Sequence, residues 1–134
     1  MMVHVSSSKA HVRREAVEID GRIPKEAVFL LLKRYSVERF GIQFAGPECL
    51  AIMKLSAAAG RDGHRNDKIL ADINDVEACL RCLLEKDKSL DDPQLRLLCT
   101  QEDVRKFIEL IQDRLPEISE DIIRNMTIAR FPYM

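Results

Sequence analysis

The spacing of hydrophobic positions in this 134-residue chain changes near residue 47. Before that point, segments 3–5, 16–20 and 38–45 alternate apolar and polar residues, a pattern typical of half-buried strands. One apolar segment, from Pro24 to Tyr35, lies between the last two of these strands, and its proline fits the first turn of a helix. Because residues 27–32 are continuously apolar, we expect this segment to be buried on more than one side.

After residue 47, apolar residues recur at three- and four-residue steps, which predicts helices. The first predicted helix begins at Pro47 and runs to about Ala59, where Gly60 supplies a C-terminal stop. The second has one apolar stripe, formed by Ile69, Ile73, Val76, Leu80, Leu83 and Leu84.

Two further helices are predicted toward the end of the chain. Thr100 is the expected N-cap of the first, with Glu102 and Asp103 in its opening turn. Its apolar stripe contains Val104, Phe107, Ile108, Ile111 and Leu115, and Pro116 ends it. The last helix is expected to begin at Ser119, capped by the serine hydroxyl, with residues 131–134 as a tail.

These elements predict an α+β fold in one domain, residues 1–134. A small mixed sheet from residues 1–46 would pack against a helical portion, residues 47–134. A hydrophobic content of 46% with 32% charged residues is typical of a globular protein with a packed core.

Charge and hydropathy exclude several classes of partner. A net charge of −1 provides no field that attracts a polyanion, so nucleic-acid binding is not expected. The longest apolar run, residues 27–32, is far shorter than the roughly 20 residues that span a membrane. The first residues do not resemble a signal peptide, because three serines follow Val5. We therefore expect a cytoplasmic protein.

The cysteines and histidines suggest no reactive centre. The four cysteines lie in apolar, helical segments and are expected to be reduced and buried: Cys49, Cys79, Cys82 and Cys99. The Cys79–Cys82 spacing suits a redox or zinc motif, but it falls within a helix and has no second ligand pair. The histidines are scattered singly, at His4, His11 and His64.

Basic residues on and after the first long helix are candidate ligands for a phosphate. Lys54 lies within the apolar body of the helix, so it either extends to solvent or points into a cleft. The following loop contains the basic residues Arg61, His64, Arg65 and Lys68 together with Asp62 and Asp67. A solvated turn is the commoner arrangement, although together with Lys54 these residues could hold a phosphate.

Asp72 and Asp75 share one face of the next predicted helix. In the early turns of that helix, the macrodipole alone would explain their charge. Alternatively, they form ion pairs with Lys54 or Arg61 that lock the two helices together.

The central segment resembles a known family. Its pattern is Pro-Glu-x-Leu-x-x-Met-Lys-Leu over 47–55, then a basic loop, then a helix containing Asp-Ile-x-Asp-Val at 72–76. Over residues 40–85 this resembles the C-terminal half of small bacterial nucleotidyltransferase-like proteins, including components of abortive-infection and toxin–antitoxin systems. The chain departs from them at Ala71, where the family commonly has lysine.

The resemblance implies a mixed sheet that carries the chemistry and helices that shape a nucleotide cleft. Family chemistry requires a Gly-Ser turn for a triphosphate, an Asp-x-Asp pair for a divalent metal and a third acid. Mg²⁺ prefers such carboxylate oxygens and offsets charge on the transferring phosphoryl group.

Two partial matches to that site exclude one another. In one, residues 5–10 replace the Gly-Ser turn, with Ser7 in place of glycine, and Glu18 and Asp20 replace Asp-x-Asp. In the other, the catalytic half is absent and Asp20 is the relic of the third acid. From the residues alone, Glu18 and Asp20 end a strand beside the turn at Gly21, with no metal.

Three functional hypotheses follow. The first is a catalytically incomplete nucleotidyltransferase-like protein that binds a nucleotide or acts as a regulatory or partner subunit. The second is a minimal Mg²⁺-dependent nucleotidyltransferase, with Glu18 and Asp20 on the metal and Ser8, Lys54 and Arg61 around the phosphates. The third is a helical protein-interaction module, in which the apolar segment 25–35 leaves a surface for self-association.

Overall fold

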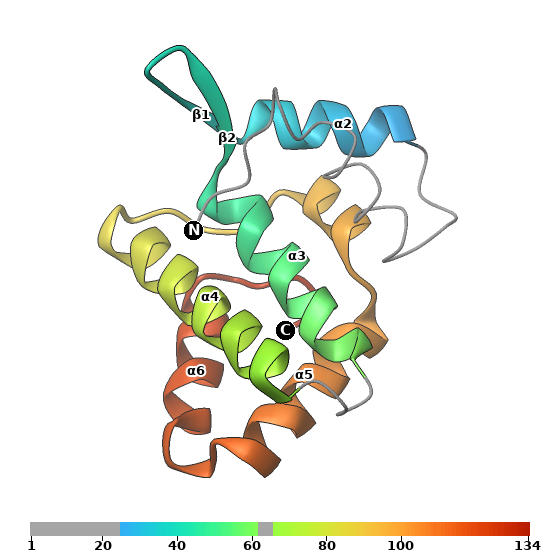
Figure 1. The fold of residues 1–134 in the computed structure, drawn as a ribbon, viewed down its shortest axis with the longest axis vertical. Helices are drawn as coiled ribbons and strands as arrows, with labels where there is room; N and C mark the ends of the chain where they lie inside the picture. Colours follow the sequence, from blue (N-terminus) through green and yellow to red (C-terminus); the bar gives the residue numbers. More distant parts are fainter. Residues whose placement is uncertain (1–24, 62–65) are drawn as a thin grey trace.

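The computed structural model describes residues 25–61 and 66–134, and these residues form an α+β fold (Figure 1). The predicted strands at 3–5 and 16–20 lie outside the described residues. Within the described part, helices predominate, and two antiparallel strands form the sheet. The expected fold class is thus confirmed. None of the described helices is long and apolar enough to cross a membrane.

Helix α3 (Pro47–Gly60) is the centre of the fold. Pro47 occupies its first turn, as predicted, and nine of its residues are buried. It packs against α4 (Asn66–Glu85), α5 (Gln101–Arg114) and the 3₁₀ helix η1 (Pro93–Leu98). Figure 1 shows α3 crossing the middle of the molecule, with α4 alongside it. Most faces of α3 therefore contact other elements.

The apolar stripe predicted for α4 is confirmed. Ile69, Ile73, Val76, Leu80 and Leu83 are buried, whereas Leu84 is partly buried. The turn that follows the helix contains a left-handed residue, Asp87, at a φ of 54°. The amide of Lys88 then donates to the carbonyl oxygen of Leu83, the hydrogen bond of a Schellman motif.

Helix α5 begins as predicted. The Thr100 hydroxyl accepts from the amide of Asp103, and the Asp103 carboxylate accepts from the amide of Thr100. The same carboxylate also accepts a hydrogen bond of 2.8 Å from the hydroxyl of Ser56 on α3. The cap that begins α5 therefore also joins it to the central helix.

The start predicted for the last helix is wrong. Helix α6 spans Pro116–Ile128, so Pro116 both follows the end of α5 and occupies the first turn of α6. Ser119 lies inside the helix, where its hydroxyl donates to the carbonyl oxygen of Pro116. Pro116 can do both because its fixed φ suits a first helical turn as well as the end of the preceding helix.

The predicted strand 38–45 is instead a hairpin. Strand β1 (Ser36–Arg39) pairs with β2 (Ile42–Ala45) in the register Ser36 to Ala45. Phe40 and Gly41 turn the chain at φ values of 54° and 75°. Two positive φ values in a two-residue loop match the right-handed twist of paired strands, which explains why the chain reverses here.

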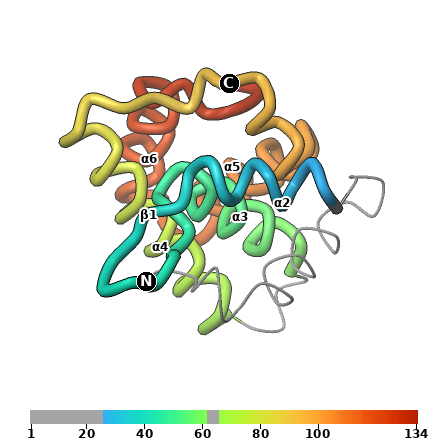
Figure 2. Tube along the Cα trace, turned by 90° about the horizontal axis from the view of Figure 1, so that it is seen from above, coloured from blue at the N-terminus to red at the C-terminus, as the bar shows by residue number. Residues whose placement is uncertain are grey.

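Helix α2 (Lys25–Arg34) precedes the hairpin. Val28, Leu31 and Leu32 are buried, as the spacing of one apolar face requires. Leu30 is 64% exposed, so the expectation that this segment is buried on more than one side is wrong. Figure 2, seen from above, shows α2 crossing over the body of helices that includes α3.

The close approach of Gly46 to Tyr35 provides a test of this packing. A Cβ at Gly46 would overlap the carbonyl oxygen of Tyr35, whereas one at Gly60 would meet nothing within 4 Å. We expect Gly46→Ala to destabilise the fold by about 2 kcal/mol, since backbone must shift to relieve the overlap. Gly60→Ala, the matched control, should be neutral or stabilising by up to about 1 kcal/mol.

The measurement is urea unfolding of both variants, followed by circular dichroism. Equal stability of the two variants would contradict the close approach of Gly46 to the Tyr35 backbone.

Candidate functional site

The structure brings together four of the predicted site residues between α3 and α4. These are Lys54, Arg61, Asp72 and Asp75. The other predicted ligands, Ser8, Glu18 and Asp20, lie outside the described residues, as do His64 and Arg65 of the basic loop.

Asp72 is the centre of this four-residue cluster. Its side chain is 6% exposed and accepts a 2.9 Å hydrogen bond from Nε of Arg61. The Lys54 ammonium lies 3.8 Å from the other oxygen of Asp72 and 3.6 Å from Asp75. The interhelical ion pairs, one of the two alternatives for these aspartates, are therefore present. Lys54 turns toward α4 instead of extending away into solvent.

The position of the aspartates corrects the macrodipole interpretation. Helix α4 begins at Asn66, so Asp72 and Asp75 lie beyond its first turn. The field of a helix terminus falls off within that turn. Their charge is instead explained by Lys54 and Arg61, which reach them from α3 and from its C-terminal flank.

The two aspartates differ in their electrostatic environments. Burial raises the pKa of Asp75, the negative charge of Asp72 raises it further, and Lys54 opposes both effects. Ionised Asp75 is thus less stable in the folded protein than in water. Asp72, by contrast, is in direct contact with the guanidinium of Arg61, at 2.9 Å.

The charges of the cluster balance, since two carboxylates face two cations. A phosphate would have to compete with Asp72 and Asp75 for Lys54 and Arg61. No group of three His, Cys, Asp or Glu side chains suited to a metal occurs among residues 25–61 and 66–134. The arrangement acts chemically as an ionic lock between two helices.

Replacing each aspartate in turn tests how much each one contributes to the ionic lock. Asp72→Asn should destabilise the protein by about 2 kcal/mol at pH 7, because it leaves Arg61 and Lys54 with weaker partners. This is below the cost of breaking a fully buried pair, since the Lys54 and Arg61 side chains are 29% and 34% exposed. Asp75→Asn should cost little or be stabilising.

The pH dependence of stability shows whether ionised Asp75 stabilises or destabilises the fold. Because the folded pKa of Asp75 is raised, its contribution to stability is complete below about pH 4 and is lost as pH rises through the folded pKa. Asp75→Asn should remove that loss. Urea unfolding from pH 4 to 7 measures it, and an equal cost for both variants at pH 7 would contradict the assignment.

The three buried cysteines lack the lowered pKa of a reactive thiol. Burial raises the pKa of Cys49 and of Cys99 to about 12, so both thiols are protonated at neutral pH. Burial, with Asp75 and Cys82 nearby, raises the pKa of Cys79 to about 11. Cys82 is partly exposed, in contrast to the expectation that all four are buried, and all four thiols are free.

The β1–β2 hairpin is fixed to the body at its base. The Tyr35 hydroxyl donates a 2.6 Å hydrogen bond to Asp92, which also pairs with Arg34 and caps η1 through the amide of Gln94. Burial and the Asp92 carboxylate raise the pKa of Tyr35 to about 12. The hydrogen bonds from Tyr35 and Gln94, with the charge of Arg34, lower the pKa of Asp92.

The tip of the same hairpin is a feature that the sequence interpretation missed. Phe40 is 100% exposed and adopts a positive φ, which is uncommon for a bulky residue. The neighbouring side chains Glu38 and Arg39 are exposed and form no ion pair within the described residues. The signal was present as Phe-Gly between two alternating segments, although Asn-Gly is the usual form.

Comparison with family models, curated proteins and solved structures finds no match for this chain. Its function is therefore inferred from the geometry of its own residues.

Proposed function

We propose that this protein is a protein-interaction subunit that binds its partner through the β1–β2 hairpin. Phe40 carries the proposal, because its side chain is fully exposed at the tip of a hairpin that stands away from the helices (Figure 1). This function corresponds to the partner-subunit form of the nucleotidyltransferase-like hypothesis. It shares protein interaction with the interaction-module hypothesis, but it uses the hairpin instead of the apolar segment 25–35. It includes the expected cytoplasmic location, which the free thiols fit.

Phe40 contributes no burial to the described fold. Burial of a phenylalanine side chain is worth roughly 1.5–3 kcal/mol, and this side chain has that energy available for a complex. A residue with a Cβ in the left-handed region also costs about 1–2 kcal/mol, which glycine avoids and asparagine partly offsets. A side chain that lowers stability and fills no core is best explained by an interaction outside the fold.

The mounting of the hairpin favours the same function. Tyr35, at its base, is held by Asp92, and within the hairpin the Ser36 hydroxyl donates to Gln43 at 2.6 Å. Gly46, at its other end, packs on the Tyr35 backbone. An anchor held in position loses less conformational entropy on binding than a flexible loop.

Phe40→Asn should separate stability from binding. Asparagine favours this turn, so the variant should be as stable as the wild type or up to about 1 kcal/mol more stable. Partner affinity should fall about tenfold or more, as expected for loss of one buried phenyl group. Thermal unfolding measures the change in stability. Binding to the purified partner, once it is identified as described below, measures the change in affinity.

The partner itself can be identified by a photo-crosslinking residue at position 40 in the cells that produce the protein. The same residue at Gln112, an exposed position on α5, is the control. We expect one protein to be crosslinked from position 40 and not from position 112, and its purified form to bind the wild type. Equal, diffuse crosslinking from both positions would overturn the proposal.

Nucleotide binding and minimal transferase activity remain separate predictions, because Ser8, Glu18 and Asp20 lie outside the described residues. Their test is thermal unfolding with ATP, GTP, CTP and UTP, each with and without Mg²⁺. A shift that needs Mg²⁺ and is lost in Asp20→Asn would favour the transferase. A shift that Lys54→Ala alone removes would favour binding only, and no shift with any nucleotide would remove both hypotheses.

A further inference from the structure

We propose that the partner is a second copy of this chain, whose groove between the ends of α4 and α6 receives the hairpin tip. This inference rests on the proposed function and names both the partner and the receiving surface.

The receiving groove is formed where two helices end side by side. Asp87 follows α4 and Arg130 follows α6, and both adopt a positive φ that turns the chain out of its helix. The amide of Leu90 donates a 2.7 Å hydrogen bond to the carbonyl oxygen of Ala129, which joins the two segments. The groove between them has a volume of about 600 Å³.

The lining of this α4–α6 groove includes apolar side chains that a phenyl ring could contact. It includes Leu84, which is partly buried, and Ile128, which is 58% exposed. Ile128, like Phe40, is a large apolar side chain left exposed by the described fold. Phe40 protrudes and Ile128 lines a hollow. Packing of Phe40 from one copy against Ile128 of another would remove both side chains from water.

The charges beside the two features are complementary. Glu38 and Arg39 directly precede Phe40 and form no ion pairs in the described part of the chain. The groove has acidic Asp87 and Asp91 along with basic Lys88 and Arg130. Its existing ion pairs are long, 3.6 Å for Arg130 with Asp91 and 3.9 Å for Lys88 with Glu48. Arg39 therefore has acids to meet in the groove, and Glu38 has bases.

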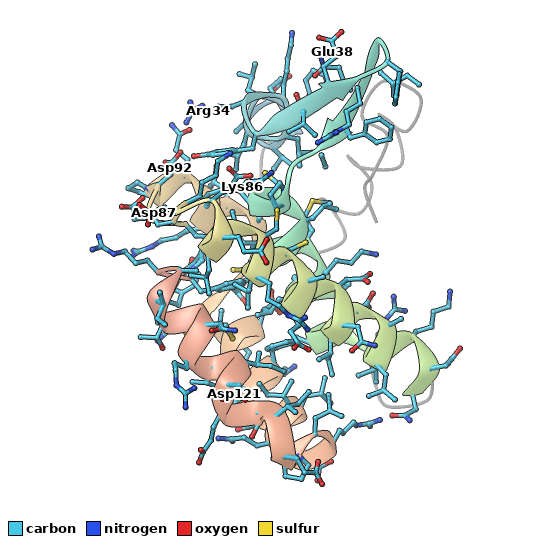
Figure 3. All side chains as sticks on the ribbon, turned by 90° about the vertical axis from the view of Figure 1, so that its left-hand side faces the viewer. Arg34, Glu38, Lys86, Asp87, Asp92 and Asp121 are labelled. Atoms are coloured by element: carbon cyan, nitrogen blue, oxygen red, sulfur yellow. The ribbon has the colours of Figure 1, made fainter. Side chains whose placement is uncertain are left out.

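The relative positions of hairpin and groove allow a closed dimer. In Figure 3, Glu38 on the hairpin and Asp87 at the end of α4 lie in the same half of the molecule, away from Asp121. In the dimer that we propose, two copies related by a two-fold axis each insert the hairpin into the groove of the other. Such an arrangement makes the same contact twice and forms a dimer instead of an open chain.

The test is sedimentation velocity of the full chain over a concentration series, with two variants. Phe40→Asn removes the phenyl ring from the hairpin tip, and Ile128→Lys places a charged side chain in the groove. Both residues are exposed, so each variant should fold. We expect the wild type to form a dimer. The dissociation constant of each variant should be at least about tenfold higher than that of the wild type. Gln112→Lys adds the same charge elsewhere on the surface and should leave the dimer intact.

Mixing the variants gives the sharpest outcome. The Phe40→Asn chain retains an intact groove and the Ile128→Lys chain retains Phe40. Together the two chains can therefore make one of the two hairpin-to-groove contacts. We expect a mixed dimer, weaker than the wild type, that neither variant forms alone. Loss of the dimer in Phe40→Asn but not in Ile128→Lys would show that the hairpin docks elsewhere and would overturn this inference.

A wild type that is monomeric throughout the series would overturn it as well. If position 40 then crosslinks to a different protein, the proposed function stands with another partner. If it crosslinks to none, both proposals fail.

Discussion

The fold depends on the burial of helix α3. Nine of its residues are buried, and α4, α5 and η1 pack against it, so any polar group on this helix needs a partner within the fold. Two such groups are met by neighbouring helices. Ser56 donates to Asp103, whose carboxylate completes the capping box of α5, and Lys54 faces Asp72 and Asp75 on α4. The polar contacts of α3 therefore specify which helix lies on which side of it.

This dependence changes the meaning of Lys54 and Arg61. As isolated residues in a sequence, two cations near a loop suggest a site for phosphate. In the structure both are paired with aspartates, and the first role of their charge is to compensate the buried Asp72. Buried ion pairs commonly add little net stability, yet removal of one partner leaves a charge with no compensation. Their most direct role is to align α3 and α4.

The hairpin is placed by the same helix. Gly46 is the N-cap of α3 and also the end of the hairpin, so the direction of α3 determines where the strands leave the body. Tyr35 and Asp92 fix the other strand to η1. Under the proposed function, stability and recognition are divided between two parts of the molecule. The helical body has most of the buried apolar side chains, while the tip exposes one phenyl ring held in a left-handed conformation.

The sequence by itself determined α3, α4 and α5, since their signals act over three or four residues, whereas the start of α6 and the helix η1 were not predicted. The stripe from Ile69 to Leu83, the start of α3 at Pro47 and the Thr100 cap all follow from such local spacing. Only the tertiary structure decided that Lys54 meets Asp72, that Leu30 is exposed and that residues 38–45 reverse direction at Phe40. An ion pair between helices depends on their packing, and exposure depends on which neighbours cover a face. The turn depends on a positive φ that Phe40 does not favour, which the pairing of β1 with β2 imposes.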